Sequence, residues 1–128
     1  IRGKKLKDIL SDLSLNELRK IFEIIAKYVA KLHSHDIIHG DLTTSNFILS
    51  NNDLYLIDFG LGFYSSRIED KATDLYLLYQ SIKSAHFNIL ESAWRIVLEA
   101  YKENFKQAEL VIKRLEEIKR RGRYKERA

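Results

Sequence analysis

The stretch IIHGDLTTSNFIL at residues 37–49 and the LIDFG at residues 56–60 contain three carboxylate or amide side chains in a fixed order. Asp41 and Asn46 are five residues apart, and Asp58 directly follows a second apolar run. Carboxylate and amide oxygens that converge suit a hard cation, above all Mg²⁺, which proteins usually share with substrate phosphates. Asp41 can also accept a proton from a nucleophile. These residue types therefore indicate phosphoryl transfer.

A β-hairpin is expected to bring these side chains together. Two short apolar runs, 47–49 and 54–57, flank the residues SNND, which are typical of a tight turn. Because the open ends of paired strands lie side by side, Asn46 before the first strand should meet Asp58 after the second. A loop over residues 39–46 precedes the hairpin, and the glycines of DFGLG follow it. The sequence thus predicts one site made by a loop and a hairpin.

Helical periodicity is found on both sides of the hairpin. Ser14 and Glu17 form a capping-box pair that opens a helix, and its apolar face ends near His35. Three further helices are expected, from about Asp70, over residues 88–104, and from about Gln107 to Arg121. Gly122 is the expected C-cap of the last one. Aromatic residues at helical spacing are expected in the core, namely Tyr28, Tyr76, Tyr79, Phe87 and Trp94. The fold class is therefore α+β, mostly helical with a small hairpin.

Composition limits the classes of protein that fit. The chain has 128 residues, 45% of them hydrophobic and 31% charged, which is typical of one soluble domain or a piece of one. No apolar run approaches the ~20 residues that a membrane span needs, so no membrane association is expected. Cys is absent, which excludes disulfides and thiolate metal sites and agrees with a cytoplasmic location. Met is also absent, and the opening residues suggest a fragment of a longer protein.

Positive charge is concentrated at the C-terminus. Residues 113–128 contain eight Lys or Arg and three Glu, so they carry +5 while the other 112 residues carry −1. One interpretation is a solvated helix end whose cations complement the helix dipole. The other is a flexible arm that neutralises RNA phosphates. The cations expected to contact RNA or a partner are Arg121, Arg123, Lys125 and Arg127.

The order and spacing of the motifs resemble the active site of protein kinases. HGDLTTSN followed by DFG is similar to the catalytic loop H-x-D-x-x-x-x-N and the metal-binding D-F-G. The resemblance implies that Asp41 is the catalytic base and that Asn46 and Asp58 bind Mg²⁺ and, through it, ATP. Four more residues are expected to support this site structurally, namely His39, Phe59, Gly60 and Asp74.

A narrower resemblance is to the atypical kinase of the KEOPS complex, of the PRPK type. Gly40 and the pair Thr43 and Thr44 stand where ordinary protein kinases have Arg and, usually, a Lys two residues after the Asp. Some fifteen residues separate Asp58 from Asp74, too few for a long activation segment, and the chain ends in the basic RRGRYKER.

This narrower resemblance implies a Mg²⁺-ATP-dependent serine/threonine kinase or ATPase that supports threonylcarbamoyladenosine modification of tRNA. The implied partners are the threonylcarbamoyl-transferase subunit, the other KEOPS subunits and, through the complex, tRNA. Residues 1–128 would be the C-terminal lobe of a kinase without its N-lobe, and residues 122–128 a basic tail.

Departures from the kinase pattern carry expectations of their own. The five glycines form no Gly-rich phosphate loop, so the isolated lobe should be a poor catalyst. Gly40 offers no guanidinium to a phosphorylated activation loop, so control by loop phosphorylation is not expected. Two alternatives stay open. One is a RIO-type or small-molecule kinase, which would carry out the same phosphoryl transfer on another substrate. The other is a non-catalytic docking module of kinase fold, which would not need the three convergent side chains.

Overall fold

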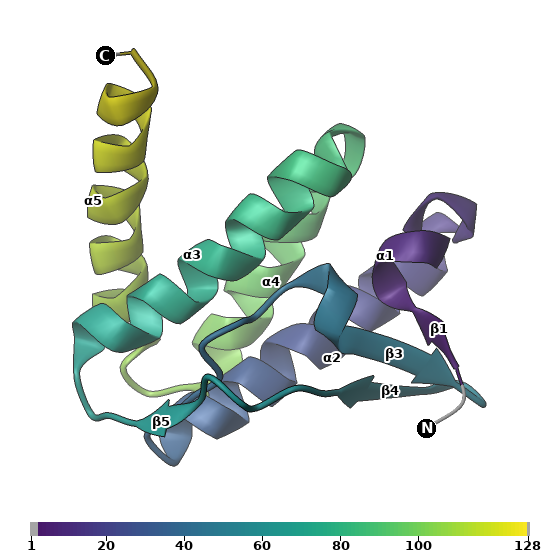
Figure 1. The fold of residues 1–128 in the computed structure, drawn as a ribbon, viewed down its shortest axis with the longest axis horizontal. Helices are drawn as coiled ribbons and strands as arrows, with labels where there is room; N and C mark the ends of the chain where they lie inside the picture. The colour runs from purple at the N-terminus through teal and green to yellow at the C-terminus, as the bar shows by residue number, and fades with distance from the viewer. Residues whose placement is uncertain (1–2, 128) are drawn as a thin grey trace.

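A computed structural model describes residues 3–127, with the backbone only for residues 123–127. Its elements in chain order are β1 (Lys4–Lys5), α1 (Leu6–Ile9), η1 (Leu10–Asp12), α2 (Leu15–Ser34), β2 (Ile37–Ile38), η2 (Thr44–Asn46), β3 (Phe47–Ser50), β4 (Asp53–Leu56), β5 (Phe63–Tyr64), α3 (Ile68–Ala85), η3 (Phe87–Ile89), α4 (Leu90–Asn104) and α5 (Ala108–Arg127). Helices make up most of the structure, and the short strands lie along one side of it (Figure 1). The α+β fold class is confirmed.

Two small antiparallel sheets frame the predicted catalytic loop. In the first, β3 lies between β1 and β4, and β3 and β4 form the predicted hairpin. Its turn is residues 51–52, both Asn with positive φ angles of 51° and 68°, which Asn tolerates better than most residues. The second sheet pairs β2 with β5. Strands of two residues are too short to show alternation, so this sheet was not predicted.

Helix α2 is bonded to the hairpin through a tyrosine side chain. Ser14 and Glu17 form the predicted capping box, because each side chain bonds to the backbone N–H of the other. α2 runs behind the hairpin in Figure 1, and the hydroxyl of Tyr28 donates to the carbonyl of Leu54 in β4 at 2.6 Å. The opposite side of α2 packs against α4. The hairpin is therefore fixed to a long helix at the centre of the fold.

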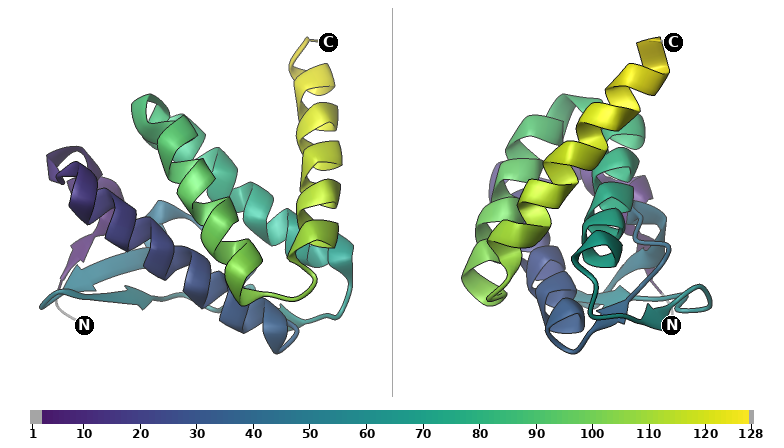
Figure 2. Two further views of the ribbon diagram at one scale, coloured as in Figure 1. Left: turned by 180° about the vertical axis from the view of Figure 1, so that it is seen from behind. Right: turned by 90° about the vertical axis from the view of Figure 1, so that its left-hand side faces the viewer.

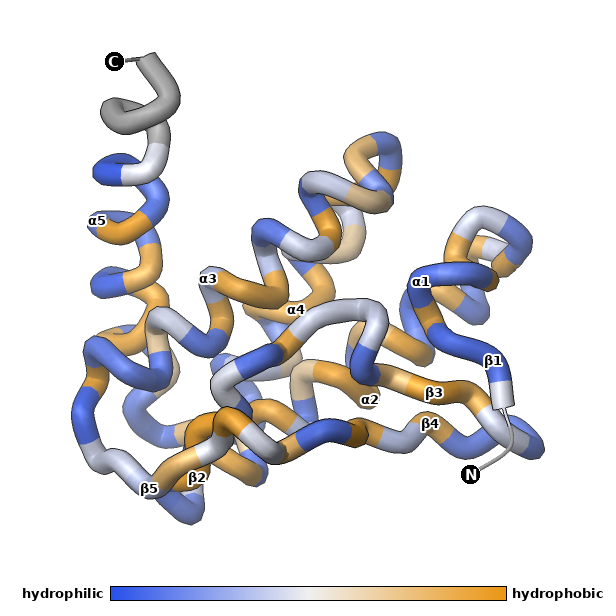
Figure 3. Tube along the Cα trace, in the orientation of Figure 1, coloured by the Kyte–Doolittle hydropathy of each residue, from blue (hydrophilic) through white to orange (hydrophobic). Residues whose placement is uncertain are grey.

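The hydrophobic core lies between α2, α3, α4 and α5, and Figure 3 shows apolar residues alternating with polar ones along these helices. Trp94 is buried as predicted, and Tyr76 and Tyr79 are partly buried. Phe87 was predicted to be in the core, but 71% of it is exposed. The prediction failed because α3 ends at Ala85, so Phe87 lies outside the helical register that placed it inside. No helix within residues 3–127 is long and apolar enough to span a bilayer.

Helix α5 does not end where the sequence predicted. A C-cap at Gly122 was expected, but α5 continues through Gly122 to Arg127. Gly inside a helix costs roughly 1 kcal/mol relative to Ala, and the structure shows a packing reason for it. A β-carbon at Gly122 would collide with the hydroxyl of Tyr76 in α3. Gly122 therefore leaves room for the end of the Tyr76 side chain, which reaches α5 from α3. Three cations of the predicted tail have side chains outside the described residues, namely Arg123, Lys125 and Arg127.

Ion pairs tie α5 to the first turn of α3. The guanidinium of Arg114 donates to Glu69, and this hydrogen bond lowers the pKa of the Glu69 carboxyl. Arg121 lies 3.8 Å from the same carboxylate. Arg121 was predicted to contact RNA or a partner, and the structure gives it an intramolecular partner as well.

The pH dependence of stability should depend in part on His86, which is buried where α3 ends. Burial, and next the charge of Lys7, lowers its pKa below the usual 6.5. In the unfolded chain His86 binds a proton near pH 6.5, whereas in the folded protein it does so only at lower pH. The stability that neutral His86 contributes is therefore fully present above pH 6.5 and is lost as the pH falls through the lowered pKa.

We therefore expect His86→Gln to reduce the loss of unfolding free energy between about pH 7.5 and about pH 5 in the complete protein. Urea unfolding at both pH values measures this. His35→Gln, at an exposed position in the same structure, is the matched control and should behave as wild type. An equal loss in wild type and His86→Gln would contradict the prediction.

Candidate active site

Asp74 fixes the catalytic loop to helix α3. Its side chain is buried, with 1% of the residue exposed, and three donors converge on it. One oxygen, Oδ1, accepts from the N–H of Gly40 at 3.0 Å. The other, Oδ2, accepts from the N–H of His39 at 3.0 Å and lies 2.9 Å from Nε2 of His33. Asp74 was expected to support the site structurally, and these contacts attach the loop to α3.

His33 and Tyr101 extend this network into α2 and α4. Nδ1 of His33 lies 2.7 Å from the hydroxyl of Tyr101, and both residues are fully buried. Burial, and next the charge of Asp74, raises the pKa of Tyr101, so its hydroxyl keeps its proton. Because the Asp74 carboxylate accepts, Nε2 of His33 carries the proton of the bond between them. Neither role was predicted from the sequence, although His33 lies on the apolar face of a helix, four residues after Val29.

His39 connects the catalytic loop to the residues on both sides of Asp58. Its Nδ1 accepts from the N–H of Asp41 at 3.1 Å, and its Nε2 donates to the carbonyl of Ile57 at 2.8 Å. The ring also meets Phe59 edge to face, with 4.6 Å between centroids. His39 thus holds the loop and the end of the hairpin in one geometry, as a structural support would.

Asp41 and Asn46 are in direct contact. Nδ2 of Asn46 donates to the carbonyl of Asp41 at 2.8 Å and to its carboxylate Oδ2 at 3.1 Å. The carbonyl of Asn46 accepts from the N–H of Ile57 at 2.9 Å, which places Asn46 at the open end of the hairpin. Asp58 is the next residue, and its φ of +63° turns the chain there. The backbone therefore brings all three predicted residues to one end of the hairpin.

Asp58 differs from the other two in being exposed and in forming no hydrogen bond to either of them within the described residues. Its Oδ1 lies over Gly60, where a β-carbon would be 3.5 Å away. This contact is of ordinary van der Waals length, so a β-carbon at residue 60 would fit beside the carboxylate.

Gly40 is required by the backbone. Its φ is +87°, and a β-carbon there would collide with the carbonyl of Leu61. The sequence showed only that an Arg is replaced, whereas the structure shows that the chain after Asp58 lies directly against the catalytic loop. A long side chain at residue 40 would force these segments apart.

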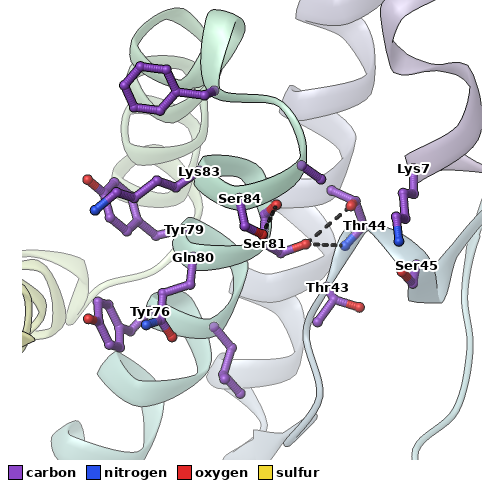
Figure 4. A pocket seen from close by; sticks show the side chains of 13 residues that line it. Lys7, Thr43, Thr44, Ser45, Tyr76, Tyr79, Gln80, Ser81, Lys83 and Ser84 are labelled. Atoms are coloured by element: carbon purple, nitrogen blue, oxygen red, sulfur yellow. Dashed lines mark hydrogen bonds between the residues drawn. The ribbon is translucent and has the colours of Figure 1, made fainter. Parts of the chain in front are cut away.

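The second half of the loop has its own anchor on α3. The N–H of Thr44 donates to Oγ of Ser81 at 2.9 Å, and the two hydroxyl oxygens are 3.2 Å apart (Figure 4). Ser81 follows Asp74 by seven residues, or two helical turns, so both anchors lie on one face of α3. Ser81 was not predicted as a site residue, because only the folded chain brings it to Thr44.

The donor set fits a hard cation that is shared with a phosphate. Both hydrogen bonds of the Asn46 side-chain nitrogen go to Asp41, so the side-chain oxygen Oδ1 keeps its lone pairs for a ligand. The exposed carboxylate of Asp58 adds an anionic oxygen. Mg²⁺ commonly takes one or two protein ligands and completes its shell with phosphate and water. Within the described residues no three His, Cys, Asp or Glu side chains gather as a metal site.

Comparison with known proteins agrees with this geometry. Residues 1–84, more than half of the chain, match the model of the protein kinase domain. The chain therefore belongs to the protein kinase domain family.

The relatives with high sequence identity have names more specific than that of the protein kinase family. Over 97% of its length the chain is 46% identical to a probable bifunctional tRNA threonylcarbamoyladenosine biosynthesis protein of Methanococcus vannielii, of which it covers 22%. A protein of the same name from Methanocaldococcus jannaschii is 44% identical over 98% of the chain. The chain is also 38% identical to the KEOPS complex subunit Bud32 of Pyrococcus abyssi and spans 59% of that protein. The resemblance to the KEOPS kinase is thereby confirmed.

Asp74→Asn should destabilise the complete protein by about 1–3 kcal/mol, because one amide oxygen cannot replace two carboxylate oxygens and a buried N–H loses its acceptor. Chemical denaturation measures the free energy of unfolding. Asp53→Asn, at an exposed position beside the hairpin turn, is the control and should change it by less than about 0.5 kcal/mol. Equal effects of the two substitutions would show that Asp74 does not hold the loop.

Proposed function

We propose that this chain is the catalytic lobe of a Mg²⁺-ATP-dependent kinase or ATPase that supports tRNA threonylcarbamoyladenosine modification. The observation that carries the proposal is the meeting of Asp41, Asn46 and Asp58 at one end of the hairpin in a chain of the kinase family. The names of the relatives, which refer to KEOPS and to tRNA threonylcarbamoyladenosine biosynthesis, support the biological setting.

Each of the three residues has a role that its contacts support. Asp41 is the base. Its Oδ2 is held by Asn46, which leaves Oδ1 to accept the proton of a hydroxyl or water nucleophile. Asn46 and Asp58 would hold Mg²⁺ through their oxygens. Bound Mg²⁺-ATP supplies a phosphoryl group whose charge is partly neutralised. His39 and Asp74 keep the loop in place, so that the base and the ligands need no rearrangement during the reaction.

The remaining kinase parts are proposed to lie in the complete protein. A Gly-rich loop, a strand Lys and its Glu partner form the other side of an ATP site. The chain spans 59% of the P. abyssi KEOPS subunit and 22% of the bifunctional M. vannielii protein. We propose that an N-lobe supplies these parts, and that the partners are a threonylcarbamoyl-transferase subunit, other KEOPS subunits and tRNA in the cytoplasm.

Asp58→Ala in the complete protein should lower ATP hydrolysis or phosphotransfer by about 10²-fold or more, because Mg²⁺ loses its anionic ligand. Asp41→Ala should lower turnover by about 10²-fold or more while nucleotide affinity stays near wild type, because a base acts in the transition state. Steady-state turnover and nucleotide titration separate the two effects. Asp53→Ala, on the exposed hairpin turn, is the matched control. Activity of Asp58→Ala within tenfold of wild type would remove Asp58 from the site.

The basic end of α5 should contribute to tRNA binding by the assembled complex. Deleting residues 123–128 removes Arg123, Lys125 and Arg127, and three phosphate contacts correspond to a salt slope of roughly 2 units at ~0.7–0.9 per contact. A salt titration of tRNA affinity with and without these residues measures the slope. Thermal unfolding of both forms is the control and should barely differ. An unchanged slope would mean that these cations do not contact tRNA and belong to a solvated helix end.

A further inference from the structure

The surface along α3 is hollowed in three adjoining places between the catalytic loop, α4 and α5. The three hollows have volumes of about 610, 480 and 550 Å³. The first and second share Tyr76 and Gln80, and the first and third share Tyr79 and Phe87. Figure 4 shows the first hollow, between the catalytic loop and α3. We call this surface the α3 groove and define it by Thr43, Tyr76, Tyr79, Gln80, Lys83 and Phe87.

The α3 groove is positively charged. The cations that line its three hollows are Lys7, Lys83, Arg95, Lys119 and Arg121, and the acids are Glu69 and Glu91. Glu69 is already paired with Arg114. The hollow beside the catalytic loop has two lysines, Lys7 and Lys83, and no acid. The third hollow has two cations and one acid, and the second has one of each, so the positive charge is concentrated beside the catalytic loop.

Aromatic rings occur along the same path. Tyr76 and Tyr79 are stacked with 6.3 Å between centroids and an angle of 14°. The ammonium of Lys119 lies 4.2 Å from the centre of the Tyr79 ring. Phe87 lines both the first and the third hollow, and 71% of it is exposed to solvent. Cations next to exposed aromatic rings are the usual means by which proteins bind the phosphates and stacked bases of a single strand.

We propose that the α3 groove binds a single-stranded segment of RNA, with a base stacked on Phe87 and phosphates at Lys7 and Lys83. The proposal rests on the proposed function in tRNA modification and adds a binding surface to it. The charge favours RNA over a protein partner, because Lys is depleted at protein–protein interfaces and attracted by phosphates. The groove begins at Thr43, two residues from Asp41, so the bound strand would pass beside the catalytic loop and continue toward the basic end of α5.

The test is binding of a fluorescein-labelled twelve-nucleotide oligouridylate, which cannot pair with itself, to the complete protein without ATP. Fluorescence anisotropy at several salt concentrations gives affinity and slope. Lys7→Gln/Lys83→Gln should lower the slope by about 1.4 units, at ~0.7 per single-strand contact. Phe87→Ser should weaken binding by about fivefold or more through the loss of a stacked base.

Matched controls lie off the groove. Lys27→Gln/Lys31→Gln removes two exposed cations from α2, and Tyr64→Ser removes an exposed ring that does not line the groove. Both should bind as wild type. Equal losses in the control lysine pair and the groove pair would overturn the proposal in favour of diffuse charge attraction. Wild-type binding by Phe87→Ser would overturn it as well, because the stacked base is part of it.

Cross-linking of the wild-type protein gives a second measurement that does not depend on a variant folding. RNA that carries 4-thiouridine should cross-link to peptides that contain Tyr76, Tyr79 or Phe87. Cross-links confined to other peptides, or groove residues that cross-link to another subunit of the complex in place of RNA, would overturn the proposal. Both measurements omit ATP, so their outcome is separate from the turnover of the Asp41 and Asp58 variants, which tests the proposed function.

Discussion

One buried carboxylate, that of Asp74, determines the geometry of the site. An ionised group without water is tolerated only where several donors compensate it. Asp74 meets this condition by bonding to two consecutive N–H groups of the catalytic loop and to His33 of α2, which in turn bonds to Tyr101 of α4. Three helices and the loop therefore share a single network. Moving the loop would leave a buried charge short of donors, which opposes any displacement of Asp41.

A second buried charge secures the segment that follows Asp58. The ammonium of Lys71 is almost fully buried, lies 2.7 Å from the carboxylate of Asp36 and rests over the ring of Phe105 at 5.1 Å. The carbonyl of Asp36 accepts from the N–H of Ser65, so the same residue holds β5 beside β2. Many kinases need a phosphate to order this segment. In this chain the segment is short and is anchored at both ends by residues of the fold itself.

Helix α5 packs against α3, which anchors the candidate site, and contains most of the basic residues 113–128. Val111 and Leu115 of α5 are fully buried, and Arg114 bonds to Glu69 at the start of α3. Beyond this anchored half the helix projects from the body, as both views of Figure 2 show. Because α5 stays helical through Gly122, its backbone continues in one direction to Arg127 and does not form the flexible arm that a break at Gly122 would allow. The anchoring thus relates the position of the basic end to the α3 groove and the catalytic loop.

The sequence by itself determined the features that neighbouring residues encode. The hairpin follows from a turn between two apolar runs, the start of α2 from a capping box, and the position of Asn46 beside the residue before Asp58 from the pairing of the two strands. Only the tertiary structure decided the roles of His33, Tyr101 and Ser81, whose partners lie far away in the chain. It also decided that Gly122 continues a helix and that Phe87 is exposed. These properties depend on which helices pack together and how closely, and a local pattern of residue types does not specify that packing.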